Sequence, residues 1–526
     1  MKKYHKLLSA SIAAAFALGT VFSGCGETEL QEPDKNAQLT ASVKLTEAAS
    51  TPRVPTATPT PTPFVPETAG HYEAEDASFT GKVHAVTGKQ DFSNSAYAEG
   101  FEGDEDTCTF KADIKKDGFY DLVFRLSSMG GEKTNFVSLD GERIGEIYIS
   151  DTVPGDAVVK RAYLSEGQHE ITVTKSWGWI RLDYLELVTS EPIDQEIYMI
   201  DKVLCNKNAS ENTKRLFSYL VDIYGKNILS GQVCDDGGLG AEIRVVHDTT
   251  GKYPAVLSMD LMNYTSSRPD GGKDGKTIEY AKAWDERGGI LEFHWHWTVA
   301  EKYTTKAWYS TFYTESTNFN LEKALNGSDP TGYEMLIADM RNMAETLRPL
   351  AEADIPILFR PLHEASGGWF WWGASGAEAY KKLYIMMYEM FTDEYNLNNL
   401  IWLWNGQDKD WYPGDEYCDI LGIDIYPGER VYTSQASKYF EVAGWSEKQK
   451  PVYLSECGCI FDPELAVRDG AMWGEFCVWQ GEFVKRASFI KLSEQYTEGY
   501  MMKKAYESDT VITLDEIPDL KKYPME

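Results

Sequence analysis

Eight short apolar runs alternate with stretches of helical pattern from about residue 194 onward, and this alternation limits the fold more than any other feature. The runs are residues 227–232, 254–260, 289–297, 355–364, 399–405, 419–426, 451–458 and 475–480. An amphipathic segment such as 333–351 lies between two of them, with one apolar face made by Leu336, Met340, Met343 and Leu347. The pattern predicts a (β/α)8 barrel over residues 194–526, with its active site at the strand carboxyl ends. A doubly wound open sheet is the alternative, but no glycine-rich phosphate loop follows the first run.

Residues 71–190 show a different pattern, of short alternating strands separated by turns. The runs 120–126 and 169–174 alternate apolar with polar side chains, and Asp-Gly or Glu-Gly turn signals recur between such runs. We therefore expect a smaller all-β sandwich in front of the barrel, within an α/β protein.

The N-terminus has the features of an export signal. Three lysines precede an apolar run over residues 7–22, which ends in Phe-Ser-Gly and Cys25. This resembles a bacterial lipobox, so we expect residues 1–24 to be a lipoprotein signal peptide and Cys25 to carry lipid. Residues 25–70 are predicted to be a linker, because the stretch 51–66 is rich in Pro and Thr and favours an extended spacer. The expected location is extracellular, with the chain anchored by lipid to the bacterial cell-surface membrane.

Charge and cysteine content limit the partners. The chain has 82 acidic and 51 basic side chains and a formal net charge of −31, which disfavours nucleic acid as a partner. Without Cys25, seven of the eight cysteines remain, an odd number without the spacing of a disulfide framework or a zinc site. We expect free, mostly buried thiols. The oligomeric state is left open.

Two glutamates follow the ends of different predicted strands. The fourth run closes with Arg-Pro-Leu-His and Glu364, and the seventh closes with Tyr-Leu-Ser and Glu456. Carboxylates at the ends of two barrel strands can face one cavity, and such a pair suffices for glycosidic cleavage. The sequence Trp369-Phe-Trp-Trp372 soon after Glu364 predicts several exposed rings that stack on a ligand.

Other predicted strand ends carry polar and aromatic side chains as well. A Tyr or His beside a carboxylate can hold it ionised by hydrogen bonding, whereas Trp402 is expected in the core and Asp424 could simply cap a loop. Metal-dependent hydrolysis is the rival interpretation. It would use His294 and His296 on one strand, with His363 as the third ligand.

Four segments make the match to a known family specific. RPLHEASGGWFWWG, GGILEFHWHW, YPGDEYCDILGIDIYP and PVYLSECG resemble glycoside hydrolase family 26, whose best-known members are endo-β-1,4-mannanases. The resemblance implies a retaining enzyme that needs no cofactor, with Glu364 as acid/base and Glu456 as nucleophile. We expect a raised pKa for Glu364 and an ionised Glu456.

The same resemblance implies the substrate and the residues that bind it. The expected substrate is a neutral β-mannan, glucomannan or galactomannan. A lichenase or xylanase of the same family, or a non-catalytic glycan-binding lipoprotein, is the alternative. The implied substrate-binding side chains are His296, His363, Trp369, Trp404, Asp424, Tyr426 and Trp479.

The smaller domain resembles a carbohydrate-binding module of family 35 or family 6, through YEAE at 72–75, KTN at 133–135 and WGWIRLDY at 177–184. Such modules hold a structural Ca²⁺, which implies Glu73, Glu75 and Asp183 as ligands. The candidates for a sugar site, which are equally candidates for core packing, are Tyr97, Asn135 and Trp177.

Overall fold

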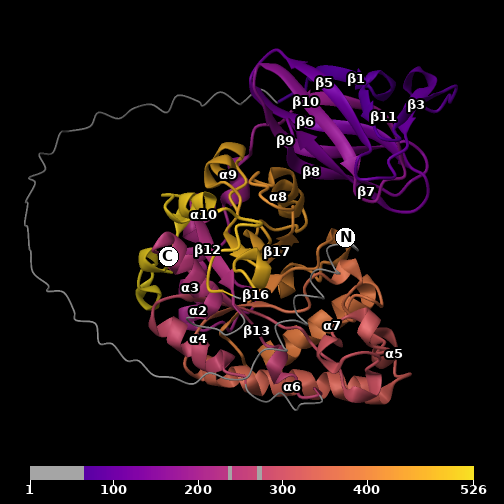
Figure 1. Cartoon of the computed structure of the whole chain (residues 1–526). Coiled ribbons are helices and arrows are strands. Elements are labelled where there is room, and N and C mark those ends of the chain that lie inside the picture. Colours follow the sequence, from indigo (N-terminus) through magenta and orange to yellow (C-terminus); the bar gives the residue numbers. More distant parts are fainter. Residues whose placement is uncertain (1–63, 235–239, 269–274, 488, 526) are drawn as a thin grey trace, which may run out of the picture. The chain divides into compact units, whose positions relative to one another are not determined.

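A computed structural model describes residues 64–234, 240–268, 275–487 and 489–525 (Figure 1). The predicted signal peptide, Cys25 and most of the predicted linker lie outside these residues. No helix in the described part of the chain is long and apolar enough to cross a membrane.

The N-terminal part is a sandwich of two antiparallel sheets, as predicted. The first sheet contains β1 (Thr68–Glu73), β3 (His84–Thr87), β4 (Ala96–Glu99), β6 (Gly118–Ser128), β9 (Gly155–Leu164) and β11 (Ile180–Thr189). The second contains β2 (Ser78–Thr80), β5 (Thr107–Ile114), β7 (Lys133–Leu139), β8 (Glu142–Ile149) and β10 (Gly167–Lys175). Alternation places one face of each strand in the core, and β5 buries Cys108, Phe110, Ala112 and Ile114.

The C-terminal part is a closed parallel barrel, so the predicted fold class is confirmed. The eight strands follow one another around the barrel in chain order, and β12 pairs with β13 to close it. They are β12 (Ile228–Val233), β13 (Val256–Asp260), β14 (Ile290–His294), β15 (Ile357–Arg360), β16 (Leu400–Trp404), β17 (Ile420–Ile425), β18 (Val452–Cys457) and β19 (Glu475–Val478). A short further strand, β20 (Val511–Ile512), adds parallel to β12.

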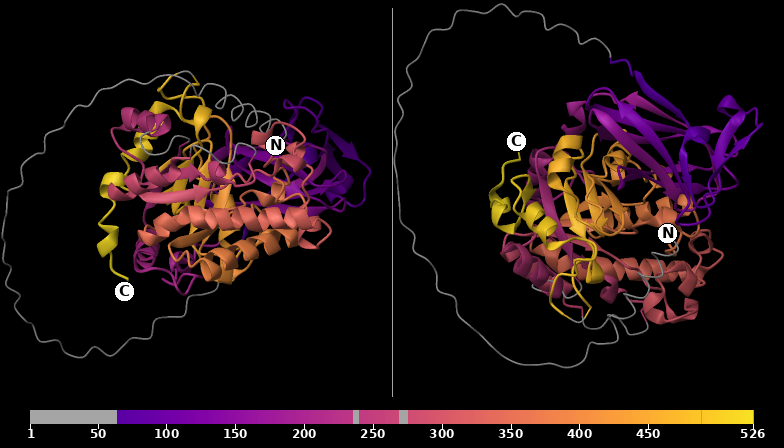
Figure 2. Two further views of the ribbon diagram at one scale, coloured as in Figure 1. Left: turned by 90° about the horizontal axis from the view of Figure 1, so that it is seen from below. Right: turned by 45° about the horizontal axis from the view of Figure 1, so that its top comes forward.

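Helices cover the outside of these strands (Figures 1 and 2). They are α2 (Glu211–Ile223), α3 (Ala241–Thr250), α4 (Thr277–Glu286), α5 (Leu321–Leu325), α6 (Pro330–Glu352), α7 (Ala377–Glu389), α8 (Ala436–Ala443), α9 (Pro463–Asp469) and α10 (Gly499–Tyr506). The predicted amphipathic segment 333–351 lies within α6, and its four predicted core side chains are all fully buried. Asp329 caps this helix, because its carboxylate accepts from the Gly332 N–H, and Pro330 follows in the first turn.

Two barrel strands end three or more residues before their apolar runs do. The run 289–297 is strand only to His294, and the run 355–364 is strand only to Arg360. Pro361 follows Arg360 directly and has no N–H to continue the ladder. His363 and Glu364 therefore lie on a loop beyond the strand.

Candidate active site

Three carboxylates meet at the carboxyl ends of β15, β17 and β18. One oxygen from each of Glu364, Asp424 and Glu456 lies within 4.8 Å of the other two. The structure thus brings together the two glutamates singled out in the sequence and adds Asp424 to them. A separation this short matches the close spacing of retaining glycosidases, whereas inverting enzymes space the pair by about 6.5–9.5 Å.

Glu364 is presented by a tight turn. Leu362 and Glu364 both have left-handed backbone conformations, with φ of 55° and 53°, which non-glycine residues seldom adopt. The Glu364 N–H donates to the Asn405 carbonyl at 2.8 Å, which ties the turn to the next strand end. Such strain, about 1–3 kcal/mol for each residue, is typical of functional sites.

The Glu364 carboxyl is almost enclosed by protein. Burial, followed by the nearby charges of Asp424 and Glu456, raises the pKa of Glu364 well above its usual value. The Trp369 indole N–H donates to Glu364 Oε2 at 2.8 Å and opposes this rise. A carboxyl that stays protonated near neutral pH can act as an acid.

Both oxygens of Glu456 accept hydrogen bonds. The Tyr426 hydroxyl donates to Oε1, and Arg360 Nη2 donates to Oε2 at 2.9 Å. Donors on both oxygens fix the orientation of this carboxylate, which can then attack a carbon atom.

Sequence reasoning missed Arg360, although it is the only cation in contact with these carboxylates among the described residues. Its guanidinium is fully buried and also contacts Asp424 Oδ2 at 3.1 Å and Glu292 Oε1 at 3.3 Å. The available signal was a charged residue inside the apolar run 355–364, since a buried charge needs partners. Burial, opposed by Arg360, raises the pKa of Asp424 to about 8.

Four further polar side chains lie beside the carboxylates. His296 Nδ1 is 2.7 Å from Asp260 Oδ2, and His294 Nε2 is 3.9 Å from the same oxygen. The His363 ring centroid is 4.7 Å from that of His296. Besides the three carboxylates, the described residues that could hold a metal are Asp260, His294 and His296, and not the three histidines expected from the sequence.

This arrangement has counterparts in known proteins. The sequence model of glycosyl hydrolase family 26 matches residues 205–506. A mannan endo-1,4-β-mannosidase of Thermothelomyces thermophilus is 35% identical over 450 residues, which cover 85% of this chain and 90% of that protein. The chain belongs to glycosyl hydrolase family 26. It is a retaining glycoside hydrolase, and family 26 catalysis needs no cofactor.

Solved structures agree with this membership. A GH26-CBM35 β-(1,4)-mannanase of Podospora anserina is 33% identical, with a TM-score of 0.59, and the match covers 87% of this chain and 99% of that one. A β-mannanase from a symbiotic protist of the termite Reticulitermes speratus, solved with gluco-manno-oligosaccharide, is 30% identical with a TM-score of 0.54 and covers 61% of this chain and 98% of that one. The N-terminal sandwich, residues 70–190, matches carbohydrate binding module family 35.

The sequence predicted several exposed rings at residues 369–372, after Glu364. This prediction is wrong for three of these four aromatic residues. Phe370, Trp371 and Trp372 are at most 3% exposed. The Trp371 indole donates to the Trp297 carbonyl beyond β14, and the Trp372 indole donates to the His363 carbonyl, so Trp372 supports the turn that presents Glu364. Only Trp369 is partly exposed.

The two other predicted sugar-binding tryptophans differ from each other. Trp404 is fully buried and packs on Tyr412 and Trp445, in the outer layer of the barrel. Side chains alternate along β16, so this ring points away from the interior, and the prediction for Trp404 is wrong. Trp479 packs instead on His294 and His296, beside the carboxylates.

The predicted calcium ligands of the family 35 module form a group of acidic side chains. Glu73 Oε2 and Glu75 Oε2 are buried without a hydrogen-bond partner. Burial raises the pKa of Asp183 to about 6, and the charges of Glu73 and Glu75 add to this rise. The hydrogen bond from the Ser93 N–H acts in the opposite direction. Buried carboxylate oxygens without partners fit a hard cation such as Ca²⁺.

The predicted sugar-binding residues of the module differ in exposure. Trp177 is 46% exposed, whereas Tyr97 is 4% exposed and Asn135 is fully buried. Of the three, Trp177 alone offers an open ring face.

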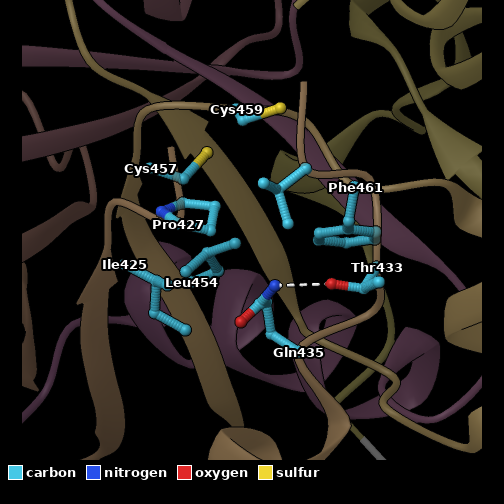
Figure 3. Close-up of a pocket in the computed structure, with 9 residues that line it drawn as sticks. Ile425, Pro427, Thr433, Gln435, Leu454, Cys457, Cys459 and Phe461 are labelled. Carbon is cyan, nitrogen blue, oxygen red and sulfur yellow. Dashed lines mark hydrogen bonds between the residues drawn. The ribbon is translucent and has the colours of Figure 1, made fainter. Parts of the chain in front are cut away.

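All seven cysteines in the described residues are free, as expected. Cys457 and Cys459 line a small apolar cavity next to β18, together with Pro427 and Phe461 (Figure 3). The cavity leaves no room for a water molecule, and burial raises the pKa of Cys457 well above its usual value. The thiol that follows Glu456 in sequence is therefore part of the apolar packing.

Proposed function

We propose that this protein is an endo-acting β-mannanase that cleaves β-1,4-mannosidic bonds in mannan, glucomannan or galactomannan by double displacement. The observation that carries the proposal is the approach of Glu364 and Glu456 to within 4.8 Å, with one hydrogen-bond donor on Glu364 and two, one of them charged, on Glu456. The names of the relatives described above support mannan as the substrate.

In the first step, Glu456 attacks the anomeric carbon while Glu364 gives its proton to the departing glycosidic oxygen. The bond from the anomeric carbon to that oxygen breaks, and a covalent glycosyl–enzyme ester forms. Tyr426 and Arg360 orient the attacking carboxylate through hydrogen bonds to its two oxygens. Burial keeps Glu364 protonated until the leaving oxygen needs the proton.

In the second step, the ionised Glu364 takes a proton from a water molecule, which attacks the anomeric carbon. The ester bond to Glu456 breaks, the carboxylate is restored, and Glu364 is protonated again. Two inversions at one carbon give net retention.

Sugar recognition is proposed for the partly enclosed side chains around the carboxylates. Trp369 presents a ring next to Glu364, and the His296 ring packs against those of His363 and Trp479. Because aromatic faces stack on the apolar faces of sugar rings, this set suits an uncharged hexose chain.

The first test is reducing-end release from linear mannan, glucomannan, barley β-glucan and xylan, by the parent and by Glu364→Gln and Glu456→Ala. Mannan cleavage that both variants lose supports the proposal. Turnover of mannan by Glu456→Ala at the parent rate would overturn the assigned roles. Cleavage of β-glucan or xylan alone would keep the mechanism and replace the substrate. Retention of polymer without any cleavage would make the chain a binding protein.

We also propose that Glu73, Glu75 and Asp183 hold a structural Ca²⁺, and that Trp177 contributes to the sugar site of the module. The unpartnered oxygens of the two glutamates support the ion.

An extracellular location with a lipid anchor at Cys25 is proposed from the sequence alone. The test is metabolic labelling with a fatty-acid analogue. The parent should take up label and remain in the membrane fraction, and Cys25→Ser should lose both properties.

A further inference from the structure

The hydrogen bonds around His294 fix the position of its proton. The Ser258 hydroxyl has one hydrogen, which it donates to Glu292 Oε1 at 2.9 Å. That same carboxylate oxygen also accepts from Arg360 Nε, so it acts as an acceptor. The oxygen of Ser258 is left to accept from His294 Nδ1–H at 3.3 Å. The proton of the imidazole is therefore on Nδ1, and Nε2 carries a bare lone pair.

That lone pair faces another acceptor. His294 Nε2 is 3.9 Å from Asp260 Oδ2, is fully buried, and has no hydrogen-bond partner. A fully buried ring nitrogen without a hydrogen-bond partner is unfavourable, and a cation that accepts its lone pair would satisfy it.

A third donor completes the group. His296 Nδ1 is 2.7 Å from Asp260 Oδ2, and the three donor atoms all lie within 4.8 Å of one another. Zinc bonds of about 2.0–2.2 Å place two tetrahedral ligands about 3.3 Å apart. On binding, His296 Nδ1 would therefore move away from Asp260 Oδ2, from 2.7 Å, and His294 Nε2 would move toward it, from 3.9 Å. Ser258 would orient one ligating imidazole through its other ring nitrogen, as hydrogen-bond partners of metal ligands do.

We propose that Asp260, His294 and His296 bind one divalent metal ion of the Zn²⁺ class. Two imidazole nitrogens and one carboxylate oxygen suit borderline metals and not Mg²⁺ or Ca²⁺. The ion enters from the side of Asp260, whose side chain is 21% exposed, because His294 is closed to solvent. On binding, the proton of the His296 imidazole moves from Nδ1 to Nε2, so that Nδ1 can bind the ion.

A consequence for catalysis follows, and it rests on the proposed function. His296 lies in the proposed sugar-binding set, next to Trp479 at a ring distance of 6.0 Å. A metal ion on His296 and a sugar therefore compete for the same place. Zn²⁺ should raise the apparent KM for mannan and leave kcat unchanged.

The test is calorimetric titration of the chelator-treated full chain with Zn²⁺. We expect one ion per parent chain, and at least about tenfold weaker binding for His294→Phe and for Asp260→Asn. The matched control is His247→Phe, because His247 lies on α3 with a side chain 40% exposed and should bind zinc like the parent. Should His294→Phe fail to fold by circular dichroism, Asp260→Asn decides.

Absorption spectra of the chain loaded with Co²⁺ test whether a thiol binds the ion. A site of nitrogen and oxygen donors gives no thiolate-to-cobalt charge-transfer band. The proposal is overturned if no saturable binding occurs, if both variants bind like the parent, or if the thiolate band appears. Zinc binding is measured without substrate, so its result does not depend on the proposed function. A chain that does not cleave mannan would contradict the proposed function, but it could still bind zinc.

Discussion

Arg360 and Glu456 form an ion pair inside the barrel, with Nη2 and Oε2 2.9 Å apart and neither side chain more than 3% exposed. The guanidinium contacts two further carboxylates, Asp424 and Glu292, which are also fully buried. One positive charge thus compensates several acidic groups that have no contact with water. Its removal should affect both the stability of the barrel and its chemistry.

Arg360→Met should lower the free energy of unfolding of the barrel by about 3–5 kcal/mol, because it leaves buried carboxylates without a partner. The measurement is urea unfolding followed by tryptophan fluorescence. Arg348→Met is the control, since Arg348 pairs with Glu345 on the surface of α6 and should cost less than about 1 kcal/mol. Equal losses in the two variants would show that the network does not support the fold.

Tyr426→Phe should lower kcat by about ten- to hundredfold, because the attacking Glu456 carboxylate loses a hydrogen bond from a neutral donor. The fold should remain, since no volume is lost. The measurement is the initial rate of mannan cleavage at saturating substrate, together with the melting temperature. Tyr500→Phe, at a residue 59% exposed, is the control and should keep the parent rate. A parent-like kcat in Tyr426→Phe would remove Tyr426 from the mechanism.

Trp369→Phe should move the alkaline limb of kcat/KM to higher pH. The indole N–H of Trp369 stabilises the ionised form of Glu364 and lowers its pKa, against the larger effect of burial. Without this donor the pKa of Glu364 rises further, so the acid stays protonated to higher pH. The pH profile of kcat/KM on mannan measures the shift.

The control for Trp369→Phe is Trp179→Phe, at a residue 48% exposed in the module, which should leave the alkaline limb in place. A shift of that limb to lower pH in Trp369→Phe would contradict the role of the indole N–H.

The barrel and its two glutamates could be predicted because their signals are local. The alternation of apolar runs with helical stretches predicted the eight strands, and the helical spacing of apolar residues predicted α6. The family resemblance pointed to Glu364 and Glu456. Arg360 and Asp260 were missed because their importance depends on which strand ends meet across the barrel. That arrangement is set by sheet closure and not by any single segment.

The errors on tryptophan have a similar origin. A ring near a strand end can point into the barrel or toward the helices, and one residue of register decides between them. Trp404 follows the inward-facing Leu403 of the barrel core and so faces outward, where Tyr412 and Trp445 cover it. Trp371 and Trp372 found backbone carbonyl partners inside the protein, which the sequence could not show.

Removal of Ca²⁺ by a chelator should lower the melting temperature of the family 35 module more at pH 7.5 than at pH 5. The folded-state pKa of Asp183, about 6, lies above its unfolded value of about 3.9. Without a cation, the folded module therefore loses stability as the pH rises from about 4 to 6, because the buried carboxyl must ionise next to Glu73 and Glu75. With Ca²⁺ bound, the ionised carboxylates become ligands and this loss disappears.

Asp183→Asn should remove the calcium effect, and at pH 7.5 with chelator this variant should melt no lower than the parent does. Asp113→Asn, at a side chain 51% exposed on β5, should keep the calcium effect. The measurement is calorimetry of the full chain, with the module transition followed at both pH values. A chelator effect that is equal at both pH values would mean that Asp183 does not hold the ion, because only a ligand that titrates near pH 6 makes the effect depend on pH in this range.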